Sequence, residues 1–264
     1  MSAIEALERR AGLPKSYYSE RGITIYHGDC LDILESLPIR FGAFVTDPPF
    51  SFAGGLSNGR SSQVDGQFFG HWWRSVCQRL TASCGDDGCG FIWCDWRTAQ
   101  AFSAGFAPRQ QTYDFWRIPQ MLYHYREMPG MGQPFRNSVD MIAYARGPKH
   151  KVLSVPNTTH NFISSYWYYG KHNHHPAEKC PEVAAKLVDW TGAEMILDPF
   201  MGSGTTLVAA KARGKGAVGI ELEEEYCEIA AKRLSQEVLR IADPMSPLEP
   251  EPKPEQLTLE IPHG

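Results

Sequence analysis

The sequence contains no uninterrupted run of about 18 apolar residues, the length that a membrane-spanning helix requires. Its first residues, 1–15, mix charged and polar side chains and lack the apolar core of a secretory signal. An internal repeat of fixed period is also missing. These absences argue against a membrane-embedded protein, a secreted protein and a repeat protein. We therefore expect a soluble protein of the cytoplasm.

The cysteines do not form a disulfide framework. There are seven of them, an odd number scattered over a chain of moderate length, which indicates a reducing compartment. Two groups could supply zinc ligands: Cys84, Cys89 and Cys94 at five-residue spacing, and the cluster His172, His174, His175 and Cys180. Neither spacing matches a familiar zinc site, so we expect no metal.

Positive charge is concentrated in the middle of the chain. The whole sequence has a formal net charge of -4, but residues 97–179 hold ten Lys or Arg against four Asp or Glu. Acidic residues are in excess towards the C-terminus instead. This segregation predicts one basic face on an otherwise acidic protein, as binding to a nucleic acid would require.

Length and patterning indicate one α/β domain. Apolar runs rich in β-branched and aromatic residues predict strands at 23–26, 43–45, 91–94, 141–145, 195–197 and 217–220. Helical segments are predicted between several of them, at 72–80, 98–106, 181–190, 205–212 and 224–239. Segments 51–70 and 155–175 are predicted to be loops at a binding face. The Pro- and Glu-rich tail, 242–264, is predicted to be disordered.

The strongest motif lies between a predicted strand and a predicted helix. It runs Asp198, Pro199, Phe200, Met201, Gly202, Ser203, Gly204, Thr205, Thr206. Its glycines allow the backbone to approach a ligand closely at a helix N-terminus. The motif lacks the Lys of a Walker loop and the spacing of a dinucleotide fingerprint. Glu221, at the tip of the next predicted strand, can accept both ribose hydroxyls, so the pair predicts a nucleoside site without phosphates.

A second motif follows the strand at 43–45. Its residues are Asp47, Pro48, Pro49 and Phe50, a turn made rigid by two prolines. The Asp47 carboxylate and the Pro48 carbonyl can accept the two hydrogens of an exocyclic amine while Phe50 stacks on the ring of an extruded base. Phe69, Trp72 and Trp73 could form a base-stacking patch, but their helical spacing favours core packing.

With both motifs in this order, the sequence resembles the β-group of amino-methylating DNA methyltransferases over roughly residues 23–234. The resemblance implies a circularly permuted Rossmann-like fold with a doubly wound, mostly parallel sheet and an antiparallel hairpin strand. It implies S-adenosyl-L-methionine as cofactor and double-stranded DNA as partner, for a monomer or homodimer in a bacterial cell or phage-infected host. It adds Asp29, His175 and Lys179 to the cofactor-binding residues, although Cys180 stands where the family has Pro.

The permutation predicts two strand pairings. The strand at 217–220 should lie beside the strand at 23–26, and the strand at 195–197 beside the strand at 43–45. Asp198 and Asp47 would then meet across one crevice at the carboxyl ends of neighbouring strands.

Asp as the first residue of the amine motif is typical of adenine-N6 enzymes in this family, and Ser of cytosine-N4 enzymes. We therefore expect transfer to N6 of adenine, with cytosine N4 and a catalytically silent DNA-binding module as alternatives. The order of the motifs argues against a protein or RNA methyltransferase. Transfer should be direct and in line, with Asp47 orienting the flipped base and no covalent intermediate.

Target recognition is expected from an insertion at 118–174 within a catalytic domain spanning 1–241. The candidate DNA contacts are its basic and amide side chains and one just before it: Arg117, Arg126, Arg136, Asn137, Lys149, Lys151 and Lys171.

Overall fold

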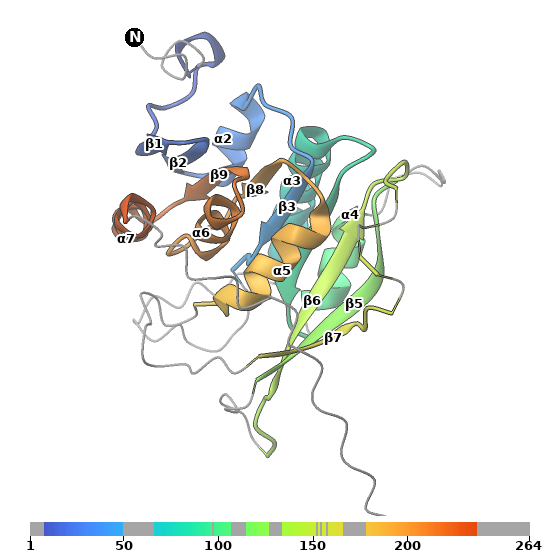
Figure 1. The fold of residues 1–264 in the computed structure, drawn as a ribbon. Coiled ribbons are helices and arrows are strands. Elements are labelled where there is room, and N and C mark those ends of the chain that lie inside the picture. Colours follow the sequence, from blue (N-terminus) through green and yellow to red (C-terminus); the bar gives the residue numbers. More distant parts are fainter. Residues whose placement is uncertain are drawn as a thin grey trace, which may run out of the picture.

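A computed structural model (Figure 1) describes residues 8–49, 66–96, 98–106, 115–126, 134–151, 153, 155–156, 158–165 and 178–236. The strands are β1 (Tyr18–Glu20), β2 (Ile23–His27), β3 (Ala43–Thr46), β4 (Cys89–Cys94), β5 (Arg117–Arg126), β6 (Val139–Arg146), β7 (Phe162–Ser165), β8 (Met195–Asp198) and β9 (Gly216–Glu221). The helices are α2 (Cys30–Ser36), α3 (Gly66–Cys84), α4 (Thr98–Phe106), α5 (Pro181–Thr191), α6 (Thr205–Ala212) and α7 (Glu224–Ser235).

The described strands form a sheet in the order β1-β2-β9-β8-β3-β4-β6-β5-β7. Neighbours from β2 to β4 run parallel, whereas β6 pairs antiparallel with both β4 and β5. Ile23 lies opposite Ala217, and Ala43 lies opposite Ile196, so both pairings predicted from the permutation are confirmed. The predicted α/β class, with a mostly parallel sheet and an antiparallel hairpin, is confirmed as well.

Helices cover both faces of the sheet (Figure 1). On one face α5, α6 and α7 contribute side chains such as Leu187 and Leu207 to an apolar cluster. On the other face α2, α3 and α4 contribute a second cluster that contains Trp73 and Phe102. Their rings lie 4.4 Å apart, and Trp73 has no exposed surface, which confirms core packing for this residue. The side chain of Phe69 lies outside the described residues.

The chain crosses from one helical layer to the other at the centre of the sheet. From β8 the order continues through β9 to β2, and from β3 it continues in the opposite direction to β4. The carboxyl ends of β8 and β3 therefore lie side by side at the switch point of a doubly wound sheet, where ligands of such folds bind. Among the described helices, none is long and apolar enough to cross a membrane.

Four elements were not predicted: β1, α2, β5 and β7. The predicted loop at 51–70 is wrong from Gly66 onward, where α3 has already begun, and the loop at 155–175 is wrong at β7. In β7 the backbone pairs with β5, so hydrogen bonding to a neighbour outweighs a weak local pattern. The tail at 242–264 and residues 51–65 and 166–175 lie outside the described residues.

Candidate active site

The glycine-rich loop joins β8 to α6 at the switch point. Gly202 and Gly204 have φ angles of 51° and 83°, in the left-handed region that side chains other than glycine rarely adopt. A Cβ atom at Gly204 would lie 2.8 Å from the Cβ of Ala230 on α7, so this glycine also permits close helix packing. A Cβ atom at Gly202 would meet nothing within 4 Å, which leaves one side of the loop open.

Asp198 ends β8 beneath this loop and is only 3% exposed. Its Oδ1 accepts hydrogen bonds from Thr46 Oγ1 at 2.7 Å and from the Phe200 amide at 3.2 Å. Burial raises the pKa of Asp198 to about 7, and the nearby charge of Asp47 adds to the rise, while these hydrogen bonds oppose it. The carboxyl group can thus change its charge near neutral pH.

Glu221 stands at the tip of β9 and faces the same loop. One carboxylate oxygen accepts from the Gly202 amide at 2.9 Å, and the other accepts from the Glu223 amide at 2.9 Å. The Gly28 amide donates to the Glu221 carbonyl at 2.9 Å, which brings Asp29 to the same edge of the sheet. Asp29 also begins α2, because its side chain accepts from the Leu31 amide at 2.7 Å.

A buried ion pair fixes the loop from behind. Arg233 on α7 lies 2.9 Å from Glu178, whose side chain is 2% exposed. The same guanidinium donates to the Ser203 carbonyl at 2.7 Å and to the hydroxyls of Ser203 and Thr205 at 3.0 and 3.3 Å. Glu178 accepts from the Thr205 hydroxyl at 3.3 Å. Ser203 and Thr205 therefore hold the loop in place, and Thr206 donates to the Val45 carbonyl at 3.4 Å.

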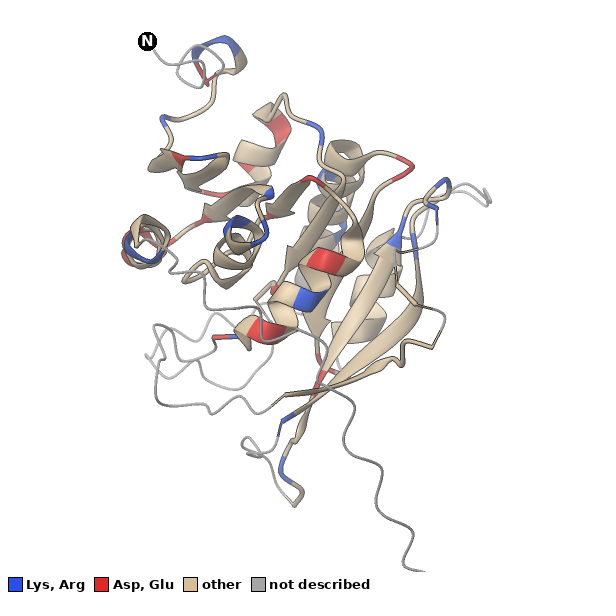
Figure 2. Cartoon of the chain, viewed as in Figure 1, with Lys and Arg blue, Asp and Glu red and all other residues tan. Residues whose placement is uncertain are grey.

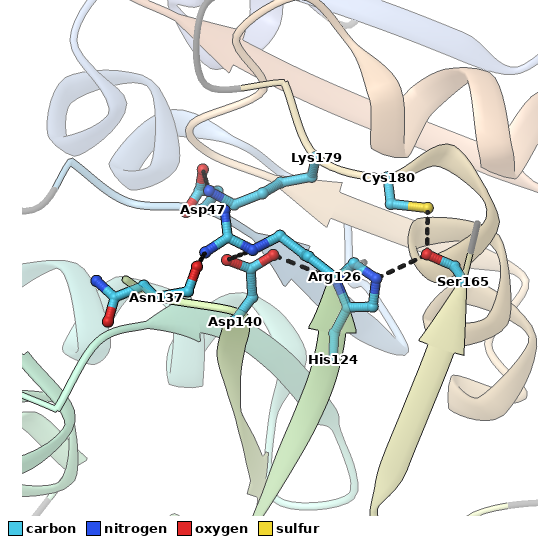
Figure 3. A network of polar contacts seen from close by, with 8 residues as sticks. All are labelled: Asp47, His124, Arg126, Asn137, Asp140, Ser165, Lys179 and Cys180. Atoms are coloured by element: carbon cyan, nitrogen blue, oxygen red, sulfur yellow. Dashed lines mark hydrogen bonds and ion pairs between the residues drawn. The ribbon is translucent and has the colours of Figure 1, made fainter. Parts of the chain in front are cut away.

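The proline motif begins directly after β3. The Asp47 carboxylate forms an ion pair with Lys179 at 2.7 Å, and both side chains are largely buried (Figure 3). Pro48 is buried and Pro49 is exposed. Phe50 and His175 lie outside the described residues. The structure thus places Lys179 against the proline motif, and its expected contact with a cofactor stays a prediction.

A cleft of about 460 Å³ opens beside this ion pair, at the carboxyl end of β4. Aromatic rings and polar groups share its wall, as a pocket for a planar polar ligand requires. Its lining residues include Trp93, Asp95, Trp96, Tyr123, Arg126, Asn137, Asp140 and Lys179.

The candidate DNA contacts do not form one group. Figure 2 shows Lys and Arg at both ends of the β5–β6 ribbon. Arg126 and Asn137 line the cleft, with Arg136 next to Asn137 in the chain. Arg117 lies opposite Arg146, at the other end of β6, and Lys149 pairs there with Asp86 at 2.8 Å. Lys151 follows shortly after Lys149, and Lys171 lies outside the described residues.

The arrangement fits a nucleoside that carries no phosphate. The loop from Asp198 to Thr206 contains no Lys or Arg, and the nearby Arg233 is engaged by Glu178. Carboxylates at Asp198 and Glu221 can accept hydrogen bonds from hydroxyl and ammonium groups but would repel phosphate. All seven cysteines are buried, and within the described parts of the chain no three His, Cys, Asp or Glu side chains are grouped to hold a metal ion.

Several residues have roles in the site that the sequence does not predict. Thr46 and Glu178 are adjacent in sequence to Asp47 and Lys179, two predicted site residues. This adjacency is the signal that could have placed them in the site. Arg233 sits on the polar side of a helix and resembles any surface arginine in sequence. Only the packing of α7 against the loop reveals its role.

Comparison with known proteins gives a consistent result. A family model described as "DNA methylase" matches residues 42–232. The Type II methyltransferase M.ScaI of Streptomyces caespitosus is 25% identical, with 86% of each chain covered. The Type II methyltransferase M2.DpnII of Streptococcus pneumoniae is 26% identical, with 85% of this chain and 94% of the relative covered.

Solved structures share the fold. The M1.HpyAVI–SAM complex matches with a TM-score of 0.61 and 22% identity, covering 80% of this chain and 99% of that one. The cytosine-N4-specific PvuII DNA methyltransferase matches with a TM-score of 0.62 and 16% identity, covering 82% of this chain and 88% of that one.

Proposed function

This chain belongs to the N6/N4 DNA methylase family, and on that premise we propose that it transfers a methyl group from S-adenosyl-L-methionine to N6 of adenine in DNA. The observation that carries the proposal is the juxtaposition of the two motifs. Thr46, the residue before Asp47, donates to Asp198 at 2.7 Å, so the amine motif and the nucleoside loop meet at the ends of adjacent strands.

The cofactor would lie along the glycine-rich loop. Glu221 would accept the ribose hydroxyls, Asp198 would face the amino acid part, and Asp29 would flank the adenine. Gly202 and Gly204 would allow the cofactor to approach the backbone of the loop closely. Pro199, Phe200 and the hydroxyls of Ser203, Thr205 and Thr206 would complete this binding loop. When bound, S-adenosylmethionine supplies an electrophilic methyl group.

The target base would enter the cleft beside Asp47. The Asp47 carboxylate and the Pro48 carbonyl would accept the two amine hydrogens, which directs the nitrogen lone pair towards the cofactor loop. A base inside a duplex cannot reach this depth, so it must be extruded from the stack. Trp96, 75% exposed at the rim, and the half-exposed Tyr123 offer aromatic surfaces for stacking.

Asp47 would also receive the proton that the methylated amine releases. Its ion pair with Lys179 keeps an ammonium group within 2.7 Å of that carboxylate. The proton would then leave to water through the open cleft. No covalent bond between enzyme and base is required, because positioning accounts for most of the acceleration.

Adenine is favoured over cytosine by Asp47 itself, since Asp in this position is typical of the adenine-N6 members that the sequence resembles. Methylation of N4 of cytosine is the second candidate, because it would use the same amine contacts.

Type II methyltransferases among the relatives support a role in DNA modification alongside restriction. We assign target recognition to the segment 118–174 of the catalytic domain.

The test is to identify the methylated nucleoside. Purified protein is incubated with unmethylated double-stranded DNA and S-adenosylmethionine carrying a deuterated methyl group. The DNA is then digested to nucleosides and analysed by mass spectrometry. N6-methyladenine carrying the label is the expected product. Labelled N4-methylcytosine would replace the base assignment, and binding of both ligands without product would indicate a silent DNA-binding module.

A further inference from the structure

A network of polar contacts links Asp140, His124, Ser165 and Cys180 (Figure 3). His124, on β5, is 1% exposed, and both of its ring nitrogens have partners. Nδ1 lies 3.2 Å from Asp140 Oδ2 on β6, and Nε2 lies 2.7 Å from Ser165 Oγ on β7. Ser165 Oγ in turn lies 3.4 Å from the sulfur of Cys180, the residue after Lys179. These contacts therefore connect β6, β5 and β7, the three strands at one edge of the sheet, to the segment that carries Lys179.

The chemistry of the two end groups, Asp140 and Cys180, determines which atoms donate and which accept along this network. Partial burial would raise the pKa of Asp140, but hydrogen bonding to His124 and the charges of Arg126 and Lys179 outweigh it and lower that pKa, so Asp140 is a carboxylate that can accept from Nδ1. Burial raises the pKa of Cys180, so its thiol keeps the proton and can donate to Ser165. Ser165 can then donate to Nε2. A neutral imidazole with its hydrogen on Nδ1 satisfies every contact.

Asp140 also organises the wall of the cleft. Its Oδ1 lies 3.4 Å from Arg126 Nε, and the Arg126 guanidinium donates to the Asn137 carbonyl at 3.1 Å. Arg126, Asn137, Asp140 and Lys179 all line the same cleft. Carboxylates and cations thus alternate from Asp47 through Lys179 to Asp140 and Arg126.

A network of this kind adds little net stability compared with apolar packing, but it specifies one arrangement of the groups it joins. Here the network holds the segment 178–180. In this segment Glu178 pairs with Arg233 behind the glycine-rich loop, Lys179 pairs with Asp47, and Cys180 contacts Ser165. Lys179 therefore lies between two residues whose side chains are anchored by buried contacts. A displacement of about 1 Å at such a site can cost on the order of 100-fold in rate.

We propose that His124 and Asp140 are positioning residues for the target-amine site, holding the segment 178–180 so that Lys179 meets Asp47. This inference rests on the proposed methyl transfer for its effect on rate, but the contact it describes can be measured without turnover. His124 does not touch the substrate in this account. It acts through Lys179.

A double-mutant cycle tests the inference. His124→Leu and Lys179→Met should each lower kcat by about 10- to 100-fold. The double variant should be no slower than the slower single variant, because both changes remove the same alignment. The dissociation constant for S-adenosylmethionine, measured by calorimetry, should change less than about threefold in His124→Leu. His150→Leu, at the other end of the sheet, is the matched control and should retain wild-type turnover.

Chemical labelling provides a readout that does not need activity. Brief acetylation followed by mass spectrometry reports the reactivity of the Lys179 amine, which the ion pair with Asp47 slows. Reactivity should rise several-fold in His124→Leu and stay unchanged in His150→Leu. If His124→Leu does not fold, Ser165→Ala and Asp140→Asn remove neighbouring links and should shift labelling in the same direction.

The outcomes separate the two proposals. Unchanged Lys179 labelling in a folded His124→Leu variant, or rate effects that multiply in the double variant, would overturn the positioning role. A wild-type protein that binds DNA and cofactor without turnover would overturn the methyl-transfer proposal, and the labelling result would still decide the role of His124.

Discussion

Two acidic residues of different character face each other across the strand ends. Asp47 is paired with the ammonium of Lys179, whereas Asp198 is buried and receives hydrogen bonds from neutral groups that include the Thr46 hydroxyl and the Phe200 amide. The cation keeps Asp47 available as an acceptor of hydrogen bonds. Asp198 instead has a pKa of about 7, so its charge responds to ligands and to pH.

The raised pKa of Asp198 predicts a specific dependence of stability on pH. Because the folded state favours the protonated form, this contribution to the free energy of unfolding is fully present below pH 3.8 and is lost as pH rises through about 7. Each unit of pKa shift corresponds to about 1.4 kcal/mol. In Asp198→Asn this loss should disappear, so the variant gains stability relative to wild type between pH 4 and 8. Urea unfolding of the ligand-free protein at several pH values measures it, and parallel curves would contradict the assignment.

Glu221 is predicted to contribute to cofactor affinity. Its carboxylate accepts a hydrogen bond from the Gly202 amide in the glycine-rich loop, and hydrogen bonds to a charged group are worth about 1.5–3 kcal/mol. Glu221→Gln should therefore weaken S-adenosylmethionine binding by about 10- to 100-fold in calorimetric titration. Glu225→Gln, on the first turn of α7, is the matched control and should bind normally. Equal affinities in both variants would remove Glu221 from the site.

At the scale of elements, α7 is held to the glycine-rich loop by the pair of Arg233 and Glu178. Both side chains are largely buried, at 13% and 2% exposed, and they join a helix to a loop 30 residues away in sequence. Another ion pair of this layer, Arg213 with Asp189, lies at the surface with side chains 27% and 43% exposed. The two pairs have similar chemistry and different burial.

Removing Arg233 should accordingly destabilise the fold far more than removing Arg213. Arg233→Met leaves the Glu178 charge buried without its cation, which typically costs about 3–5 kcal/mol, whereas loss of an exposed pair costs about 0–1 kcal/mol. Denaturant unfolding of Arg233→Met and Arg213→Met compares them directly. Similar losses in the two variants would show that the buried pair does not hold the loop.

Elements with a strong local signal were predicted, and elements that depend on neighbours were not. Strand β8 begins with the continuous apolar run 195–197, and α5 begins at a proline and ends at a left-handed glycine, Gly192. By contrast, β5 contains the buried polar residue His124, which only its partners Asp140 and Ser165 explain. The three-residue strand β1 at the sheet edge is too short to carry a pattern.

The candidate site divides in the same way. Asp47, Asp198 and Glu221 follow strands that the sequence predicts, and their neighbourhood follows from the order of the strands. Arg233 and His124 depend on how a helix and a strand pack, which no local motif encodes. The pairing of Lys179 with Asp47 joins segments 132 residues apart and was not foreseen.

At the scale of the whole molecule, charge is unevenly distributed on a chain with a formal net charge of -4. Arg126 lines the cleft and Arg136 precedes the lining residue Asn137, while Lys149 follows the other end of β6 and pairs with Asp86. Figure 2 shows Lys and Arg at both ends of the β5–β6 ribbon. If the cleft accepts the target base as proposed, the DNA would pass over Arg126 and Arg136. The charge distribution therefore predicts that the duplex contacts this face of the molecule.

The salt dependence of DNA binding tests this orientation. Each phosphate contact contributes about 0.9 to the slope of log K against log salt concentration. Arg136→Ala should reduce the magnitude of the slope by about 0.9, the value for one phosphate contact, and Lys149→Ala should leave the slope unchanged. Fluorescence anisotropy with a labelled duplex at several salt concentrations measures both. A reduced slope for Lys149→Ala alone would place the duplex at the opposite end of the sheet.

The most direct test of the account compares wild-type protein with Asp47→Ala in the labelled-methyl assay, with nucleosides identified by mass spectrometry. Wild-type protein should convert adenine in DNA to N6-methyladenine. Asp47→Ala should bind S-adenosylmethionine with wild-type affinity but form product at least about 100-fold more slowly, because the acceptor that orients the amine is gone. Turnover of Asp47→Ala near the wild-type rate would contradict the central claim that the amine is methylated at this carboxylate.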